Sequence, residues 1–106
     1  MALDDIDEEN GGLIVLPGSN TDDILAMSPI DTSQSFTDTA VQPDAQYTEH
    51  LVEMEKGDLL FFYGRLIHGS TQNRSSTRFR KTFICHYISA GSTIYNNGYD
   101  PIVSLD

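Results

Sequence analysis

The chain of 106 residues has few basic residues, one cysteine and no long apolar run. Six Lys and Arg stand against 16 Asp and Glu, so the formal net charge is −10. So few cations argue against binding to the nucleic-acid backbone or to an anionic membrane surface. Cys85 has no second cysteine with which to form an internal disulfide, which fits a reducing compartment. Because the sequence shows neither a membrane-length apolar run nor a signal-peptide pattern, we expect a cytoplasmic protein.

The charges are distributed unevenly along the chain. Residues 1–55 contain 13 acids and no Lys or Arg, whereas residues 56–106 contain all six bases and three acids. The acidic part is typical of a solvated surface. If the chain binds an anion, the site is expected in its second half.

Short apolar runs separated by turn residues predict an all-β fold of the sandwich or barrel kind. A short helix of at most two turns is expected to begin at Thr21. Residues 28–48 have no apolar period and are predicted to form a long irregular loop. We expect residues 1–106 to form a single domain with a tail at 89–106. The strand candidates are 13–16, 50–54, 59–63, 66–70, 79–88 and, in the tail, 102–104.

A few side chains could carry chemistry, but composition alone leaves their roles open. His68 lies on a strand candidate, where a lone histidine is more often structural than a ligand. Arg80 is the charged residue on one face of the 79–88 segment, so it needs a carboxylate or phosphate partner, either internal or external. His50, His68 and His86 recur at equal intervals that match no short metal-ligand motif. Cys85 falls on the aromatic face of its segment and is predicted to lie in the core.

Four ordered segments of the sequence resemble the phytanoyl-CoA dioxygenase-like family over most of residues 2–88. The resemblance implies an incomplete double-stranded β-helix, which is a jelly-roll, cupin-like fold. It also implies an Fe(II)- and 2-oxoglutarate-dependent oxygenase acting on a small-molecule substrate. The matching segments are Asn10 to Ser19, His50 to Phe62, Leu66 to Asn73 and Phe79 to Tyr87.

The family binds iron with two histidines and one carboxylate, which leaves positions for 2-oxoglutarate and dioxygen. In this resemblance His68 matches the distal histidine ligand. Arg80 matches the arginine that pairs with the far carboxylate of 2-oxoglutarate, a role suited to a planar, permanently charged group. Ser70, two residues after His68, resembles a hydrogen-bond donor to the same carboxylate.

Three departures from the family pattern affect this reading. The His-x-Asp pair of the family does not occur here and is expected upstream of Met1, so the chain resembles a C-terminal half. Asn20 replaces a histidine of the family pattern. The interval from His68 to Arg80 is one residue longer than usual, so Arg78 competes with Arg80 for the same role. Arg80 is preferred, because Lys81 and Cys85 to Tyr87 after it keep the register of the family motif. Asp4 or Asp5 could substitute for the missing carboxylate, although the family pattern makes them turn residues.

Two hypotheses about function follow. In the first, the chain is a member or fragment of an Fe(II)/2-oxoglutarate-dependent hydroxylase that is inactive by itself. The alternative is a non-catalytic β-domain, either an interaction module or an inactive truncated homologue. In both cases unpaired strand edges favour a homo-oligomer or a strand-swapped dimer.

Overall fold

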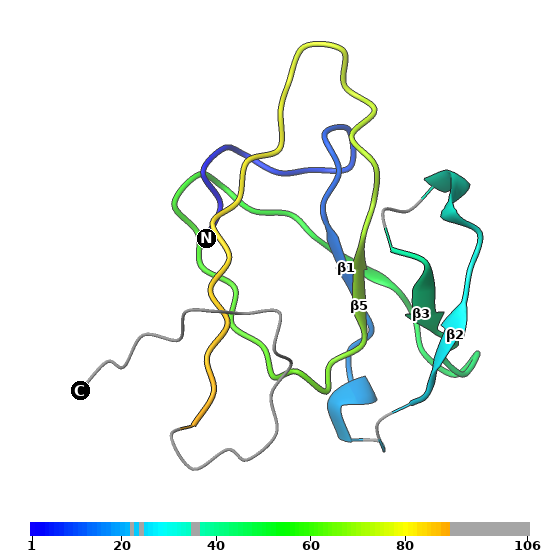
Figure 1. The fold of residues 1–106 in the computed structure, drawn as a ribbon. Coiled ribbons are helices and arrows are strands. Elements are labelled where there is room, and N and C mark those ends of the chain that lie inside the picture. Colours follow the sequence, from blue (N-terminus) through cyan, green and yellow to red (C-terminus); the bar gives the residue numbers. More distant parts are fainter. Residues whose placement is uncertain (22, 24, 35–36, 90–106) are drawn as a thin grey trace.

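The protein is described by a computed structural model that covers residues 1–21, 23, 25–34 and 37–89. Short strands in two small antiparallel sheets, with single 3₁₀ turns between them, confirm the all-β prediction (Figure 1). The 3₁₀ turns of the described residues are far too short to cross a membrane. The elements are β1 (Leu13–Val15), η1 (Ser19–Thr21), β2 (Met27–Pro29), η2 (Thr32–Gln34), β3 (Thr39–Val41), β4 (His50–Val52) and β5 (His68–Ser70).

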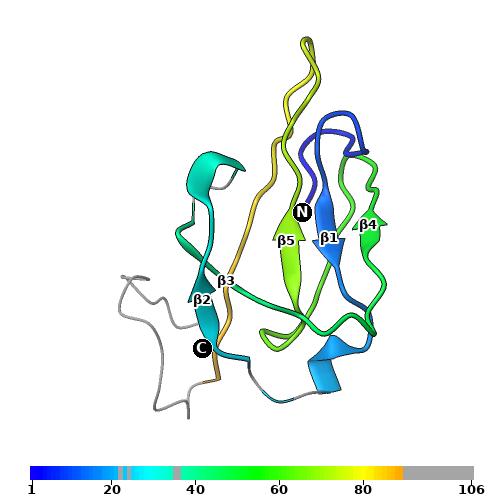
Figure 2. The same ribbon diagram turned by 90° about the vertical axis from the view of Figure 1, so that its right-hand side faces the viewer.

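The larger sheet has the strand order β4-β1-β5, and both pairings are antiparallel (Figure 2). Val15 lies opposite His50 on one side and opposite His68 on the other. Directly opposite residues of antiparallel strands project to the same face of the sheet. The sheet therefore places His50, Val15 and His68 in one row, and Ser70 follows two residues along on the same face.

The smaller sheet is the pair β2–β3, in which Met27 lies opposite Val41 and Pro29 opposite Thr39. This pair falls largely within residues 28–48, so the long loop contains more regular structure than its sequence indicated. The residues around β2 and β3 are mostly polar, so no apolar run marked these strands in the sequence. The helix predicted to begin at Thr21 is not found in the described part of the chain. Thr21 instead ends η1, where its hydroxyl donates to Gly18 O at 2.8 Å.

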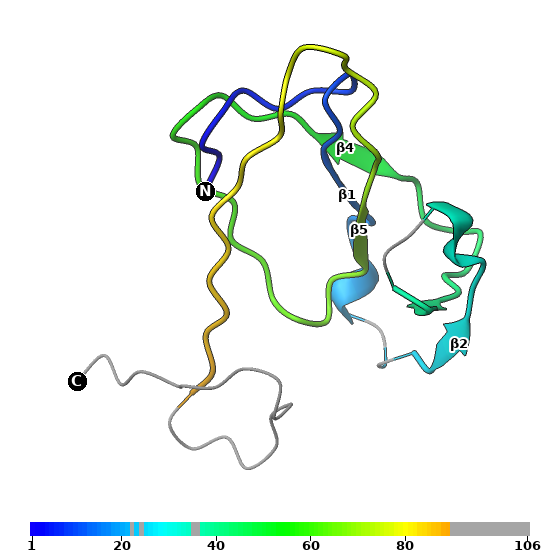
Figure 3. The same cartoon turned by 45° about the horizontal axis from the view of Figure 1, so that its top comes forward.

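The small core is formed by the N-terminal part of the chain. Two buried polar side chains, Asn10 and Ser19, accompany the apolar ones and are hydrogen-bonded. Isolated bridges join Ala2 to Thr82 and Ile6 to Met54, so the first residues cross over two later segments of the chain (Figure 3). The buried apolar residues among those described are Ala2, Ile6, Val15 and Leu16.

Two of the predicted strands, 59–63 and 79–88, are not strands in the described structure. Residues 79–88 make one bridge, at Thr82, and then run away from the three-stranded sheet (Figures 1 and 3). Phe61 is 78% exposed and Tyr63 is 82% exposed. A strand needs a neighbouring strand to pair with. Here residues 1–3 pair only as far as Phe83, whose N–H donates to Met1 O at 2.9 Å.

The prediction that Cys85 lies in the core is wrong, because Cys85 is exposed. The interaction of its thiol with the side chain of Tyr87, two residues along, raises the pKa of the Tyr87 phenol. The aromatic side chains of the 79–88 segment, Phe79, Phe83 and Tyr87, are also exposed. The predicted strand at 102–104 and nearly all of the predicted tail lie outside the described residues.

Candidate functional site

His68 begins β5, an edge strand of the larger sheet, and its side chain is exposed. Its Nδ1 lies 2.8 Å from Leu66 O, a carbonyl oxygen that can only accept a hydrogen bond. The proton is therefore on Nδ1, which leaves the Nε2 lone pair available. The Phe62 ring, with its centroid 4.7 Å from that of His68, stands beside the imidazole. A backbone carbonyl that fixes the tautomer and the ring orientation is the usual second partner of a metal-ligating histidine.

Arg80 reaches the C-terminal end of β5. Its Nη1 donates to Thr71 O at 3.0 Å, and Thr71 directly follows Ser70. The residue is half-buried, yet among the described residues it makes no ion pair. A half-buried guanidinium without a carboxylate partner is able to bind an external anion. The structure thus brings the Arg80 guanidinium to the residue that follows Ser70.

Arg78 is engaged elsewhere. Its Nη1 lies 2.7 Å from Asp7 Oδ2 and 3.3 Å from Glu9 Oε2, and its Nη2 donates to Asp5 O at 3.2 Å. The hydrogen bond from Arg78 is the main reason that the pKa of Asp7 lies below its usual value of 3.8, and the same bond raises the pKa of Arg78. Arg78 therefore anchors the acidic N-terminal turn.

The alternative carboxylates are also engaged. Asp4 Oδ2 lies 3.3 Å from Lys81 Nζ, and Asp5 Oδ1 accepts the Lys56 N–H at 2.8 Å. In the described part of the chain, no three His, Cys, Asp or Glu side chains gather into a group that could hold a metal ion. Of the iron ligands that the resemblance implies, the described residues thus fit a single one, His68.

Sequence reasoning missed two buried polar residues that support this region. Asn10 is 0% exposed, and Ser19 Oγ accepts the N–H of Ile67, the residue before His68, at 2.9 Å. Both lie in the first matching segment, but its Asn-Gly-Gly and Pro-Gly-Ser sequences indicated only turns. Asn20, the residue that departs from the family pattern, is exposed in η1.

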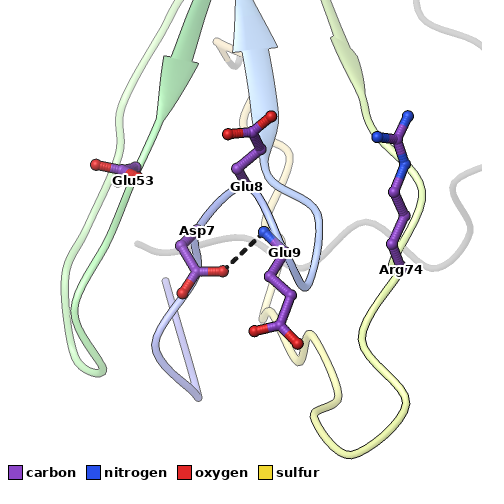
Figure 4. A pocket seen from close by; sticks show the side chains of 5 residues that line it. All are labelled: Asp7, Glu8, Glu9, Glu53 and Arg74. Carbon is purple, nitrogen blue, oxygen red and sulfur yellow. Dashed lines mark hydrogen bonds between the residues drawn. The ribbon is translucent and has the colours of Figure 1, made fainter.

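A separate hollow of about 380 Å³ opens beside the acidic turn (Figure 4). Asp7, Glu8 and Glu9 of the turn lie between Glu53, which follows β4, and Arg74, which lies in the loop after β5. The lining includes none of the predicted site residues. The Asp7 carboxylate accepts the Glu9 N–H at 3.0 Å, so this contact stabilises the turn itself.

This arrangement is an all-β domain in which an exposed histidine begins an edge strand. Beside the end of that strand lies an arginine with no ion pair among the described residues. Comparison with known proteins identifies the class to which it belongs. The family described as Phytanoyl-CoA dioxygenase (PhyH) matches residues 1–82. The chain belongs to this family, which confirms the resemblance.

Curated relatives agree with this assignment. Human peroxisomal phytanoyl-CoA dioxygenase is 38% identical over an alignment of 96 positions, and the match covers 84% of this chain and 27% of the human protein. The rat protein is 39% identical over 97 positions, with the same coverage of the two chains. A probable phytanoyl-CoA dioxygenase of Caenorhabditis elegans is 34% identical over 100 positions, and the match covers 91% of this chain and 31% of that protein.

The chain thus spans about a quarter to a third of the length of these relatives. No solved structure matches it. Family membership implies a general dependence on Fe(II) and 2-oxoglutarate. The alternative of a non-catalytic module is not favoured, because the curated relatives are named as dioxygenases.

Proposed function

We propose that this chain supplies the distal histidine ligand and the 2-oxoglutarate-binding arginine of an Fe(II)/2-oxoglutarate-dependent hydroxylase with a small-molecule substrate. The observation that carries the proposal is the half-buried Arg80, which lies beside the end of β5 and has no counter-ion among the described residues. Nη1 of the neighbouring Arg78 is ion-paired with Asp7 and Glu9, which engages this guanidinium at the acidic turn. Membership of the dioxygenase family supports the chemistry.

In this proposal each residue has a distinct task. His68 offers Nε2 to iron, while its Nδ1–H donates to Leu66 O and keeps the ring from rotating. Arg80 forms a bidentate pair with the far carboxylate of 2-oxoglutarate through the donors that do not bind Thr71 O. Ser70 lies on the same face of β5 as His68 and donates its hydroxyl to that carboxylate.

Fe(II) bound with 2-oxoglutarate would supply a reaction with dioxygen in which 2-oxoglutarate is oxidised to succinate and CO2. One oxygen atom of dioxygen would enter succinate and the other would hydroxylate a C–H bond of the substrate. No His-x-Asp occurs in the sequence, so we propose that the remaining ligands lie outside these 106 residues. The chain by itself is then a binding element and does not turn over substrate. The proposed cytoplasmic location remains a prediction.

The test is an anaerobic titration of Fe(II) and 2-oxoglutarate into the purified chain, followed by the visible charge-transfer band of chelated iron. We expect a band that His68→Ala and Arg80→Ala both abolish. His50→Ala is the matched control for the histidine, because His50 is exposed on the opposite edge strand. Arg74→Ala is the control for the arginine, because Arg74 is exposed in the loop after β5. A band that either substitution leaves unchanged contradicts the proposal. Absence of the band in the folded wild-type chain means that iron is not chelated without the ligands outside these residues. The deciding observation is then whether 2-oxoglutarate binds and whether Arg80→Ala, but not Arg74→Ala, weakens that binding.

We also propose that the chain associates with a second copy of itself. In the described sheet β4 and β5 each have one neighbour, and several large apolar side chains of residues 59–63 and 79–88 are exposed. Free edges and apolar surface favour association. Sedimentation velocity over a wide range of protein concentration should show a dimer that Ile84→Asp, at an exposed position, dissociates. A monomer at every concentration contradicts this proposal.

A further inference from the structure

The turn formed by Asn10, Gly11 and Gly12 touches both segments that hold Arg80. Asn10 is completely buried, and each polar atom of its side chain has a partner. Its Oδ1 accepts the Asp7 N–H at 2.9 Å. Its Nδ2 donates to Asp5 O at 2.7 Å and to Phe79 O at 3.2 Å. Because Phe79 directly precedes Arg80, this carboxamide fixes the backbone from which the Arg80 side chain starts.

Gly11 lies against the other contact of Arg80. Its φ is +82°, and an added Cβ would stand 2.8 Å from both Thr71 O and Gln72 O. Thr71 O is the same atom that accepts the hydrogen bond from Arg80 Nη1. A side chain at position 11 would therefore displace the Thr71 carbonyl oxygen, which is the hydrogen-bond acceptor of the Arg80 guanidinium.

Gly12 completes the turn and forms two hydrogen bonds with Thr71, one through its N–H and one through its carbonyl oxygen. The Gly12 N–H donates to Thr71 Oγ1 at 2.9 Å, and the Thr71 N–H donates to Gly12 O at 3.0 Å. Thr71 follows β5 directly, so these bonds fix the end of the strand that contains His68 and Ser70. The three residues thus connect the end of β5 to the segment of Arg80.

We propose that the Asn10–Gly12 turn is a positioning element that sets the Arg80 guanidinium relative to β5. It acts through Thr71 O and Phe79 O and contacts neither iron nor 2-oxoglutarate. The proposal rests on the function proposed above for Arg80. A bidentate pair requires its donors to be held within a fraction of an ångström, which explains why a fully buried carboxamide and a glycine in contact with a carbonyl are found here.

The turn should control the affinity for 2-oxoglutarate more than it controls folding in general. The test compares Gly11→Ala with Gly57→Ala. Gly57 also has a positive φ, of +101°, but a Cβ there would meet nothing within 4 Å. Both variants therefore carry the backbone strain of alanine in the left-handed region, and only Gly11→Ala displaces Thr71 O.

At saturating Fe(II), we expect Gly11→Ala to raise the half-saturating concentration of 2-oxoglutarate by about tenfold or more, as the loss of a supporting contact does at metal sites. Gly57→Ala should leave it near the wild-type value. The affinity for Fe(II) alone should be the same in both variants, because His68 is oriented by Leu66 O. Equal 2-oxoglutarate affinities in two folded variants overturn the proposal.

A second readout does not depend on the cofactor. In ¹⁵N-arginine NMR spectra at low temperature, the hydrogen bond to Thr71 O should slow the rotation of the Arg80 guanidinium. We expect Gly11→Ala to remove this slow rotation and Gly57→Ala to keep it. A wild-type chain that binds no 2-oxoglutarate would contradict the proposed function, while this signal would still decide whether the turn positions Arg80.

If Gly11→Ala does not fold, Thr71→Val and Thr71→Ser replace it. Valine removes the Oγ1 that accepts the Gly12 N–H, whereas serine keeps such an acceptor. Slow guanidinium rotation lost in Thr71→Val and retained in Thr71→Ser supports the proposal. Identical spectra of the two variants overturn it.

Discussion

The burial of the N-terminal region and of the most apolar segments is the reverse of what their composition predicts. Residues 1–16 include five acids, yet they contain the buried apolar residues of the described structure. Residues 59–63 and 79–88 contain most of the aromatic residues and are largely exposed, Phe83 for example by 57%. Hydrophobicity therefore did not decide burial here. A segment is buried only where other segments fold over it.

The acidic region folds into a buried turn because its polar groups are hydrogen-bonded to one another and to residues 78 and 79. Asp7 accepts hydrogen bonds from the Glu9 and Asn10 backbone and from Arg78, while Asn10 bonds three backbone groups. No buried side-chain N or O atom of the described residues lacks a hydrogen-bond partner. A fully paired network of this kind specifies one conformation, so the turn can bury Ile6 beside it.

The largest expected effect separates the two regions directly. Leu16→Ala removes a buried side chain and should lower the free energy of unfolding by about 3 kcal/mol. Phe83→Ala, at an exposed position, should change it by less than about 0.5 kcal/mol. Urea unfolding of the monomer at low protein concentration measures both values. If Phe83→Ala strongly lowers the free energy of unfolding at low protein concentration, the segment is buried in the monomer. If the loss of stability appears only at high protein concentration, it supports association with a second copy.

A smaller effect is expected at the buried carboxamide. Asn10→Ala removes the partner of the Phe79 carbonyl and of the Asp7 N–H and one of the two donors to the Asp5 carbonyl, which should cost about 2 kcal/mol. Asn20→Ala, at an exposed position of η1, is the matched control and should change stability by less than about 0.5 kcal/mol. Urea unfolding again provides the measurement. Equal effects would contradict the view that the polar network holds the acidic region closed.

The smallest effect is the acid dependence of the Asp7–Arg78 ion pair. The pKa of Asp7 is lowered in the folded state, so its stabilisation is present above the ordinary value of 3.8 and is lost as the pH falls through the lowered pKa. Arg78→Gln should return the Asp7 pKa toward 3.8 in an NMR titration of the carboxyl groups. It should also weaken the acid dependence of the urea midpoint.

Asp31 provides the internal control for this titration. Its pKa is lowered by hydrogen bonds from Ser33, so Arg78→Gln should leave it unchanged. A shift at both carboxyls would indicate a general loss of structure. No shift at Asp7 would mean that Arg78 does not pair with it in solution.

Part of the fold could be predicted from the sequence because the signal is local. The run Leu13 to Leu16 between glycines and a proline predicted β1, and short apolar runs predicted β4 and β5 within one or two residues. The strands expected at 59–63 and 79–88 were wrong for the described structure, since an apolar alternating run says nothing about whether a pairing neighbour exists. β2 and β3 were missed because they lie in a stretch rich in Ser, Thr, Asp, Gln and Pro, without the continuous apolar run that marks β1.

The candidate site was predicted only in part, because its contacts join segments that are far apart in the sequence. His68, Ser70 and Arg80 came from ordered motifs, and family membership supports the motifs without testing each residue. The sequence favoured Arg80 over Arg78 because of the register of the residues that follow, and it gave no information on the contacts of either side chain. Arg78 pairs with Asp7, whereas Arg80 reaches Thr71 O. Asn10 was read as a turn residue because burial of its carboxamide is decided by chain segments far from it in sequence.

By itself the sequence determined the all-β class, the family and the uneven distribution of charge, and it singled out the candidate site residues. These results follow from residue types, short-range patterns and motif order. The tertiary structure alone decided that Asn10 is buried, that Arg78 is ion-paired while Arg80 has no ion pair among the described residues, and that residues 59–63 and 79–88 are largely exposed. Burial and pairing are properties of surfaces that meet in space, and a strand or a charge acquires them only when its partner folds against it.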